Sequence, residues 1–281
     1  MSLFPSHRRR PRSPSLNVAR IPYLNAQPFS YGWGDEPPFE VVDMMPRALG
    51  RAAAEGSVDA GLMAVADYFG LDGTFELTVP PMGIAVRDHV RSVVLLARRR
   101  PRHLDGRRIG ITGESSTSRR LLELLARARW EVAPEWVPED ELGADPRESV
   151  DGLLLIGDRA LEAMADQRRH GWERVVDLAT AWWEWQRQPF VFAVWAMRTT
   201  LPRRERERLS GFLTGSLAVG SEHLGEIAAA AASERLGTRD DLAAYLRNFV
   251  YRLSQAERKG LQRFRDLLAE HDILEYQQTP V

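Results

Sequence analysis

The sequence predicts a two-lobed α/β protein with a ligand cleft between the lobes and a helical C-terminal segment. Short apolar runs alternate with amphipathic stretches from residue 16 onward, which indicates strands joined by helices. A second series of the same kind follows the charged, proline-containing link Arg98–Arg102. A long apolar strand then leads back to the first series, and the residues after Pro202 show helical spacing. Two chain crossings between two units predict a hinge with a cleft beside it.

The composition is that of an ordinary globular protein, and it excludes several kinds of site. Of 281 residues, 44 % are hydrophobic and 27 % are charged, and a chain of this length buries a core that needs no metal or disulfide. The absence of cysteine excludes disulfides, zinc–thiolate sites and cysteine nucleophiles. Lys259 is the only lysine, and its place in a polar helix argues against Schiff-base chemistry. The net charge of -1 argues against a general nucleic-acid binder.

The first residues are basic and rich in proline and serine, and they predict a disordered leader over 1–15. A secretory signal needs an apolar segment of roughly 7–15 residues after its basic part. Here the strand that begins at Leu16 is broken at Pro22. The chain also has no apolar stretch of roughly 18 residues, so no membrane span is predicted. We therefore expect a cytoplasmic protein without a membrane partner.

The first unit begins with an apolar strand over 16–21 and a short amphipathic helix over 26–33. The polar amide of Asn25 lies at the joint between them. Asn25 can cap the helix, or it can point into a cleft, and this stretch alone leaves both roles open. The other expected elements of the unit are a helix over 47–55 and strands over 39–45, 59–66, 77–81, 83–87 and 92–97. The β-α-β-α-β order of the first elements predicts a parallel sheet with right-handed crossovers.

The second unit is predicted to be an insertion into the first. Its expected strands lie over 108–112, 131–137, 152–156 and 174–178, and its expected helices over 119–129, 159–167 and 180–187. An apolar strand over 189–197 then returns towards the first unit. The predicted first lobe is therefore 16–98 plus 196–281, and the predicted second lobe is 99–195.

The remainder of the chain is predicted to be helical over 203–234, 239–251 and 256–273. Gly237 and Thr238 interrupt the helical spacing after the first of these stretches. Thr238 is a candidate N-cap because Asp241 follows it by three residues, as in a capping box. These helices complete the first lobe.

Three polar joints would face the cleft if the two units are arranged as predicted. The first carries Tyr23 and Asn25. The second is the hydroxyl-rich turn Ser115–Ser118, where hydroxyls and free backbone N–H groups offer a site for a carboxylate or phosphate. The third is Gly157 followed by Asp158. The hydroxyls and the Asp158 carboxylate can also be plain N-caps that bind nothing. The residues alone thus predict a cleft suited to a small anion, without a reaction.

The sequence lacks the motifs of several enzyme classes. The glycine-rich nucleotide patterns, the His-Glu-x-x-His zinc pattern and the Gly-x-Ser-x-Gly elbow are absent, and the histidines show no metal-ligand spacing. No metal or cofactor is therefore expected. The aromatic residues Trp182, Trp183, Trp185, Phe190 and Phe192 can wall an aromatic ligand or pack between helix and sheet, and packing is the expected main role.

Four stretches together resemble one family. Arg20–Pro28 is similar to its opening R-I-x-Y-L-N-x-x-P segment, and Ser115–Ser118 to its S-x-T-S turn. Leu154–Asp158 resembles its L-I-G-D segment, and Pro189–Trp195 its P-F-V-F-A-x-W segment. The matches occur in the family's order and cover about residues 16–198. The family is chorismate dehydratase of the futalosine route to menaquinone.

The resemblance implies a periplasmic-binding-protein-like fold of type II, used as a cytoplasmic enzyme. It implies the loss of water from chorismate to give 3-[(1-carboxyvinyl)oxy]benzoate, without cofactor or metal. We expect Asn25 to be the catalytic residue that orients the reacting edge or binds the leaving hydroxyl. The expected substrate-binding residues are Tyr23, Ser116, Thr117, Ser118, Gly157 and Asp158. No general base lies in the matched joints, so the substrate's own enolpyruvyl carboxylate is expected to take the proton.

Two departures from the family pattern bear on the site. The third strand usually carries a serine near its end, where this chain has Ala64. Before the returning strand the family often reads Thr-Gly-Leu, where this chain has Gln186-Arg187-Gln188, so an arginine replaces glycine in a turn. The hydroxyl contact is therefore absent, and the turn carries arginine at the position of the glycine.

Two other functions fit the same fold. A solute-binding protein of a transporter would bind an anion without reaction, and no signal segment or lipidation cysteine supports it here. The sister enzyme of the pathway, 1,4-dihydroxy-6-naphthoate synthase, acts on a larger ring. The Tyr23-Leu24-Asn25 and Pro189–Trp195 stretches favour the dehydratase over it. The sequence leaves the oligomeric state open.

Overall fold

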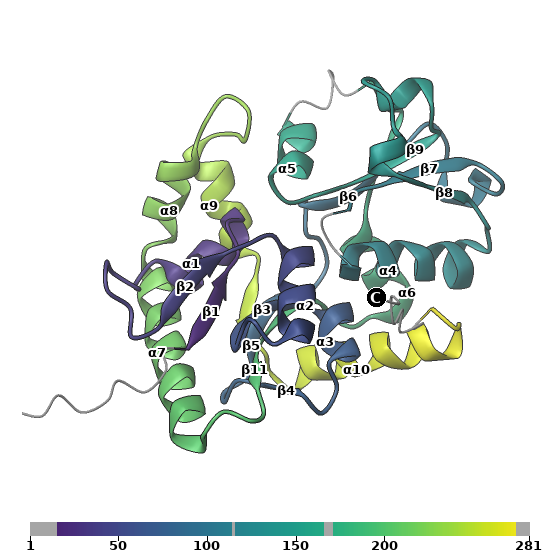
Figure 1. Ribbon diagram of the computed structural model, residues 1–281. Helices are drawn as coiled ribbons and strands as arrows, with labels where there is room; N and C mark the ends of the chain where they lie inside the picture. Colours follow the sequence, from purple (N-terminus) through teal and green to yellow (C-terminus); the bar gives the residue numbers. More distant parts are fainter. Residues whose placement is uncertain (1–15, 114–115, 166–170, 274–281) are drawn as a thin grey trace, which may run out of the picture.

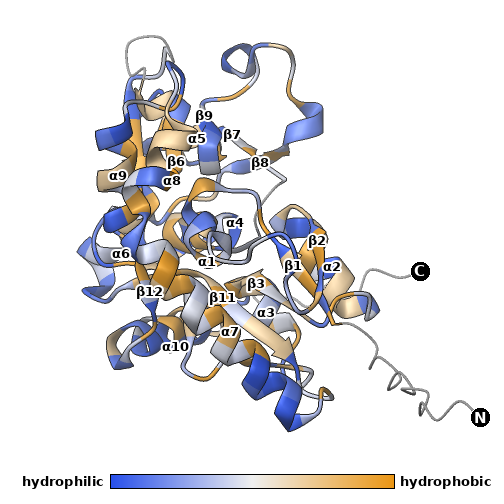
Figure 2. Ribbon diagram, turned by 90° about the vertical axis from the view of Figure 1, so that its left-hand side faces the viewer, coloured by the Kyte–Doolittle hydropathy of each residue, from blue (hydrophilic) through white to orange (hydrophobic). Residues whose placement is uncertain are grey.

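The computed structural model describes residues 16–113, 116–165 and 171–273, so the expected leader over 1–15 lies outside the described residues. Two β-sheets form two lobes, each flanked by helices (Figure 1). Apolar residues gather along the strands, and hydrophilic residues lie on the outlying helical turns (Figure 2). This separation is the expected outcome of burying the apolar face of each element.

The first sheet runs in the order β12–β5–β11–β3–β1–β2, with β4 also paired to β11. Its strands are β1 (Asn17–Arg20), β2 (Glu40–Asp43), β3 (Ala60–Ala64), β4 (Phe75–Leu77), β5 (Met82–Val86), β11 (Phe190–Arg198) and β12 (Val250–Arg252). As predicted, β1 is parallel to β2 and β3. The returning strand β11 is antiparallel to β3 and β5, so the whole sheet is mixed.

The second sheet runs in the order β10–β6–β9–β7–β8. Its strands are β6 (Val93–Ala97), β7 (Arg108–Ile111), β8 (Glu135–Pro138), β9 (Gly152–Ile156) and β10 (Arg174–Asp177). β7 is parallel to β8 and β9, whereas β6 is antiparallel to both of its neighbours.

The helices occupy most of the remaining chain. They are α1 (Gln27–Ser30), α2 (Pro46–Glu55), α3 (Val65–Gly70), α4 (Ser116–Leu124), α5 (Gly157–Ala165), α6 (Leu178–Gln186), α7 (Arg203–Glu222), α8 (Leu224–Ala231), α9 (Arg239–Arg247) and α10 (Gln255–Glu270). Short 3₁₀ turns lie at Leu24–Ala26, Pro101–His103, Glu139–Glu141 and Pro146–Glu148, and α4 continues as a π-helical turn over Leu125–Trp130.

Local sequence signals explain where several helices begin and end. Pro46 opens α2, and Gly56 ends it in the left-handed conformation that glycine adopts without steric cost. Thr238 and Asp241 form the predicted capping box of α9. The predicted single helix over 203–234 is wrong, because the chain breaks at His223 into α7 and α8. The predicted helix over 239–251 is likewise shorter, because Val250–Arg252 forms the edge strand β12.

The chain crosses between the sheets earlier than the sequence predicts. The predicted first lobe included the strand over 92–97, but β6 lies between β10 and β9 in the second sheet. The predicted second lobe extended to residue 195, but β11 is a central strand of the first sheet. Both boundaries failed for one reason: an apolar strand buried on both faces carries no signal of which sheet it joins.

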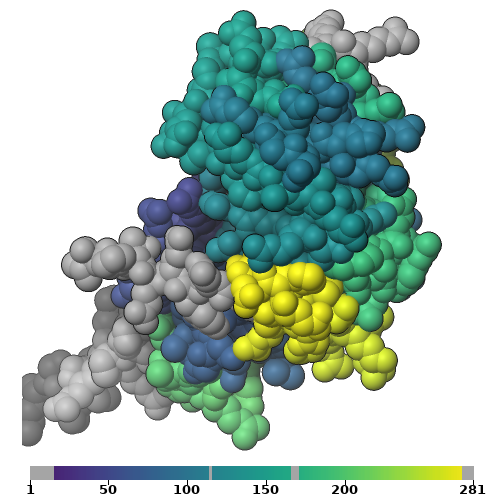
Figure 3. Space-filling view, turned by 90° about the vertical axis from the view of Figure 1, so that its right-hand side faces the viewer, coloured from purple at the N-terminus to yellow at the C-terminus, as the bar shows by residue number. Residues whose placement is uncertain are grey.

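The C-terminal helix α10 packs across the junction of the two lobes. Its Phe264 ring lies 4.9 Å from Phe190 of β11 and 5.9 Å from Trp182 of α6, measured between ring centroids. On its other side the Phe264 ring approaches Phe69 of α3, at 6.2 Å. Figure 3 shows this helix, in yellow, directly against the teal second lobe. The last part of the chain thus stabilises the junction through aromatic packing.

Candidate functional site

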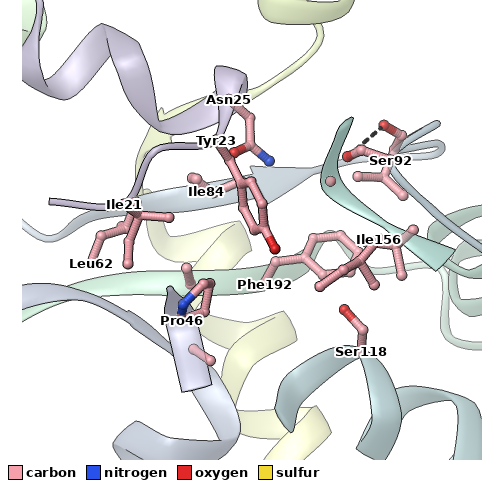
Figure 4. A pocket seen from close by; sticks show the side chains of 15 residues that line it. Ile21, Tyr23, Asn25, Pro46, Leu62, Ile84, Ser92, Ser118, Ile156 and Phe192 are labelled. Carbon is pink, nitrogen blue, oxygen red and sulfur yellow. Dashed lines mark hydrogen bonds between the residues drawn. The ribbon is translucent and has the colours of Figure 1, made fainter. Parts of the chain in front are cut away.

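A pocket lies between the two sheets, at the ends of strands from both lobes (Figure 4). It holds about 550 Å³ of empty space, which includes its opening to solvent. The lining residues are Ile21, Tyr23, Asn25, Pro46, Leu62, Ala64, Ile84, Val90, Ser92, Val93, Ser118, Ile156, Gly157, Phe192 and Ala193. The position matches the rule that open α/β sheets bind ligands outside the carboxyl ends of their strands.

Asn25 belongs to the pocket and does not cap a helix. The 3₁₀ turn that holds Asn25 begins after Tyr23, and α1 begins after Ala26, and neither start has a side-chain cap. The Asn25 amide instead lies on the pocket wall, beside the Tyr23 ring that enters the pocket from the same joint (Figure 4). The structure therefore favours the cleft role of this joint over the capping role.

Ser92 is a polar pocket residue that the sequence reasoning missed. It is 1 % exposed and lies on the stretch by which the chain first crosses between the sheets. Its carbonyl accepts a hydrogen bond from the backbone N–H of Gly157, at 2.8 Å, which ties this stretch to the start of α5. No motif marks such a position, because Ser92 is a single serine between two apolar strands.

Tyr245 of α9 lies behind Asn25 and Ser92. Burial raises the pKa of the Tyr245 phenol well above its ordinary value, and hydrogen bonds from Ser92 and Asn25 together with the nearby Arg91 oppose this rise. The negative charge of Asp158 adds to it. A C-terminal helix thus reaches the back of the site, and the phenol stays protonated at neutral pH.

The three hydroxyls at the start of α4 point in different directions. Successive helical residues are about 100° apart around the axis, so three in a row project towards different sides of the helix. Ser118 lines the pocket, and its hydroxyl points into it (Figure 4). Ser116 and Thr117 do not line it. Of these three predicted carboxylate ligands, the geometry therefore supports Ser118 alone.

Thr117 connects the two lobes. It is fully buried, and its Oγ1 accepts a hydrogen bond from the backbone N–H of Ala66, at 3.1 Å. Ala66 is in the first turn of α3, whose N-cap residue, Ala64, has no side chain able to cap. Thr117 of one lobe therefore caps a helix of the other lobe. Its predicted contact with the substrate stays a prediction.

Ser116 lies beside the buried carboxyl of Asp67 in α3. Burial raises the pKa of Asp67 to about 6, while Ser116, Arg47 and Arg120 lower it in part. Ser116 Oγ and Asp67 Oδ2 are both buried. Ser116 therefore faces the lobe junction, and its predicted role as a carboxylate ligand stays a prediction.

Gly157 lines the pocket where β9 passes into α5. Its φ of +59° is in the left-handed region, and a Cβ at this position would lie 2.9 Å from the Tyr23 ring of the other lobe. Only glycine combines this backbone with so close a contact. Asp158 follows in the first turn of α5, and it does not line the pocket. The third predicted joint is thus in the site through Gly157, with Asp158 beside it.

The aromatic cluster divides between packing and lining. Trp182 is fully buried, with its indole N–H donating to the carbonyl of Gln188 and its ring against Phe190 and Phe264. Phe192 lines the pocket (Figure 4). Packing is the main role of the cluster, as expected, and Phe192 offers a flat apolar surface to a ring.

Charge is absent from the described part of the pocket wall. Among its described lining residues no side chain is ionised at neutral pH, and none is a histidine. The polar lining groups are the phenol of Tyr23, the amide of Asn25 and the hydroxyls of Ser92 and Ser118. The described residues also hold no cluster of acidic or histidine side chains able to bind a metal ion. The pocket can orient a ligand through neutral hydrogen bonds and the N-terminus of α4.

Both departures from the family pattern are visible in the structure. Ala64 lines the pocket without a hydroxyl. Arg187 ends α6 with a φ of +54°, so this arginine adopts the left-handed conformation that suits glycine. The turn before β11 therefore has a left-handed residue at this position although the residue is not glycine.

The fold resembles that of several solved structures, a periplasmic binding protein among them. A structure from Archaeoglobus fulgidus aligns with a TM-score of 0.76, at 22 % identity, over 93 % of this chain and 99 % of that one. The periplasmic aliphatic sulphonate-binding protein of Escherichia coli aligns with a TM-score of 0.59, at 16 % identity, over 93 % and 88 %. The protein thus has the predicted two-lobed, periplasmic-binding-protein-like fold. None of its helices within 16–113, 116–165 and 171–273 has the length and apolar character to cross a membrane.

The amino-acid sequence is similar to that of a known enzyme and matches a family profile. A chorismate dehydratase of Thermus thermophilus is 36 % identical over an alignment of 244 residues that covers 82 % of this chain and 87 % of that protein. The profile of the family described as menaquinone biosynthesis matches residues 16–270. That match spans both sheets and every polar residue of the pocket wall. The chain belongs to the menaquinone biosynthesis family, as its motifs predict.

Proposed function

We propose that the protein is a chorismate dehydratase, a carbon–oxygen lyase that converts chorismate into 3-[(1-carboxyvinyl)oxy]benzoate and water. The observation that carries this proposal is the meeting of Tyr23, Asn25, Ser92 and Ser118 around one aromatic-walled pocket between the lobes. The 36 % identity to the Thermus thermophilus enzyme supports the same reaction. The proposal includes a cytoplasmic reaction that needs no cofactor.

The reaction is an elimination that the substrate itself drives. A base removes the proton from the ring carbon that bears the enolpyruvyl ether. The electron pair left behind delocalises towards the ring carboxylate, and the C–O bond to the neighbouring hydroxyl then breaks. The proton and the hydroxide leave together as water, and the ring becomes aromatic. The protein therefore needs to position the substrate and stabilise a transient negative charge.

The neutral lining groups suit these two tasks. Ser118 lies near the start of α4, and its hydroxyl and the helix dipole favour the ring carboxylate, where negative charge develops. Asn25 lies on the opposite lobe and supplies an amide to the leaving hydroxyl. Ser92 and Tyr23 add hydrogen bonds, and Phe192 packs against the ring.

The base is proposed to be the enolpyruvyl carboxylate of the substrate. The described lining residues include no carboxylate or imidazole that could serve instead. Proton transfer within one bound molecule is efficient when the acidic C–H and the carboxylate are held close together and aligned. We propose that the two walls of the pocket hold the substrate in this way. A chorismate analogue without that carboxylate should bind but fail to lose water. Normal turnover of this analogue would contradict the proposal that the substrate's own carboxylate is the base.

The direct test is turnover of chorismate by the purified full chain, without added metal or nucleotide. We expect enzyme-dependent loss of one water, followed by mass and by aromatic absorbance. Asn25→Ala should lower kcat by roughly 100-fold or more, as loss of a transition-state donor does. Asn17→Ala is the matched control, because Asn17 is at the far end of β1 and its amide donates to the carbonyl of Ser57.

Other outcomes of this test are equally informative. Binding of chorismate without turnover would contradict the proposal and favour a binding protein of the same fold. Neither binding nor turnover would point to another anion or to the larger substrate of the sister synthase. Equal losses in Asn25→Ala and Asn17→Ala would show that Asn25 acts through stability alone.

A further inference from the structure

The stretch over which the chain first crosses between the sheets, residues 87–92, has an unusual backbone; we refer to it as the crossing turn. Arg91 adopts a φ of +61°, which is uncommon for any residue other than glycine. The residues on either side of Arg91, Val90 and Ser92, both line the pocket. A strained residue between two pocket residues persists only where its surroundings hold it in place.

The carboxylate of Asp177 holds this turn. Its Oδ2 accepts hydrogen bonds from the backbone N–H groups of Val90, at 2.9 Å, and Arg91, at 2.7 Å. Its Oδ1 accepts from the N–H groups of Ala179, at 2.9 Å, and Thr180, at 3.0 Å, and so caps α6. One carboxylate therefore serves four backbone donors, two on each oxygen.

This arrangement connects both chain crossings. Asp177 is the last residue of β10 and is paired with Val94 in the second sheet. The helix that it caps, α6, leads directly into β11 and back to the first sheet. The crossing turn and the start of the return path thus share one anchor.

We propose that Asp177 is a positioning residue for the dehydration: it fixes the crossing turn so that Ser92 and Val90 meet the substrate. This inference rests on the proposed function. Asp177 does not line the pocket, so it acts through the backbone of the turn and not on the substrate. Only a carboxylate suits the position, because both of its oxygens must accept hydrogen bonds at once.

Substitutions of Asp177 can separate this role from capping. Asparagine and serine are as good N-caps as aspartate, whereas alanine is not. Neither Asn nor Ser has two acceptor oxygens in its side chain. Asp177→Asn and Asp177→Ser should therefore keep the cap of α6 and lose the hydrogen bonds from the crossing turn. Asp177→Ala loses both. The matched control is Asp145→Asn, since Asp145 caps the turn Pro146–Glu148 away from the pocket.

The experiment measures kcat/KM for chorismate and the melting temperature of each full-length variant. We expect all three Asp177 variants to lose roughly 10- to 100-fold in kcat/KM, as small misplacements of pocket groups do. The melting temperatures of the Asn and Ser variants should exceed that of the Ala variant. Asp145→Asn should stay within about 2-fold of the wild-type kcat/KM.

Two results would overturn the inference while the proposed function stands. One is wild-type kcat/KM in Asp177→Asn. The other is activity that rises and falls with melting temperature across the three variants, which would show that only the cap matters. A wild-type chain without turnover would instead overturn the proposed function, and this inference with it.

Discussion

Arg187 ends a helix in a backbone conformation that costs free energy for any residue other than glycine. It ends α6 in the left-handed conformation, with its N–H donating to the carbonyl of Trp183 at 2.9 Å, and its side chain is exposed. A non-glycine residue in this conformation costs roughly 1–2 kcal/mol. The surrounding structure holds Arg187 in this conformation despite that cost.

We therefore expect Arg187→Gly to stabilise the protein. The gain should be roughly 0.5–1 kcal/mol, since glycine removes the steric cost but adds freedom to the unfolded chain. Urea unfolding measures it. Arg258→Gly is the control, because Arg258 is exposed in α10 past its first three residues, and the protein should lose about 1 kcal/mol on the same replacement. Destabilisation by both substitutions would show that the Arg187 backbone carries no strain.

At the scale of elements, α4 serves both lobes through its first turn. Ser118 faces the pocket, Thr117 caps α3 and Ser116 faces Asp67. The sequence predicted this turn as one anion site, because a run of hydroxyls marks a helix start without saying which way each hydroxyl points. Direction comes from the helix axis, and the axis is set by packing between lobes that the local sequence does not encode.

The capping role of Thr117 can be tested by transferring the capping hydroxyl to residue 64, the N-cap position of α3. Thr117→Val keeps the side-chain volume and leaves the N–H of Ala66 without an acceptor, so it should cost roughly 1–2 kcal/mol. Ala64→Ser places a hydroxyl at the N-cap of α3 itself. Thr117→Val should therefore cost less in the Ala64→Ser background, as a double-mutant cycle in urea measures. An equal cost in both backgrounds would exclude capping as the role of Thr117.

Element prediction succeeded where the signal is local and failed where it is not. The Tyr23–Asn25 joint and the Gly157 turn each combine a strand end with a helix start, and both were predicted to belong to the site. Ser92 has no such context, since its place in the pocket depends on the path between sheets. The parallel pairing of the first three strands was predicted from their alternation with helices, but the partners of β6 were not.

For the molecule as a whole, Asp67 links stability to pH at the lobe junction. Its carboxyl is buried between α2, where the Cβ of an alanine at Gly50 would lie 2.7 Å from it, and Ser116 of α4. Its pKa is about 6 in the folded protein and 3.8 as the ordinary value. The unfolded chain therefore loses this proton first, and the free energy of unfolding falls as the pH rises from about 4 to about 6.

Asp67→Asn should remove this pH dependence. The amide cannot ionise, so the variant should gain up to about 3 kcal/mol in free energy of unfolding at about pH 7.5 and little below about pH 4. Urea unfolding at the two pH values measures the difference. Asp35→Asn, at an exposed carboxylate, is the control. A gain that is the same at both pH values would show that ionisation of Asp67 is not its source.

The early crossing of the chain has a consequence for biosynthesis. All five strands of the second sheet lie within residues 93–177, whereas the first sheet needs β11 and β12 from the later part of the chain. On the ribosome the inserted lobe is complete while the first sheet has only β1 to β5, of which β3, β4 and β5 still lack their shared neighbour β11. We expect the insertion to fold first, and the lobe that begins the sequence to fold last.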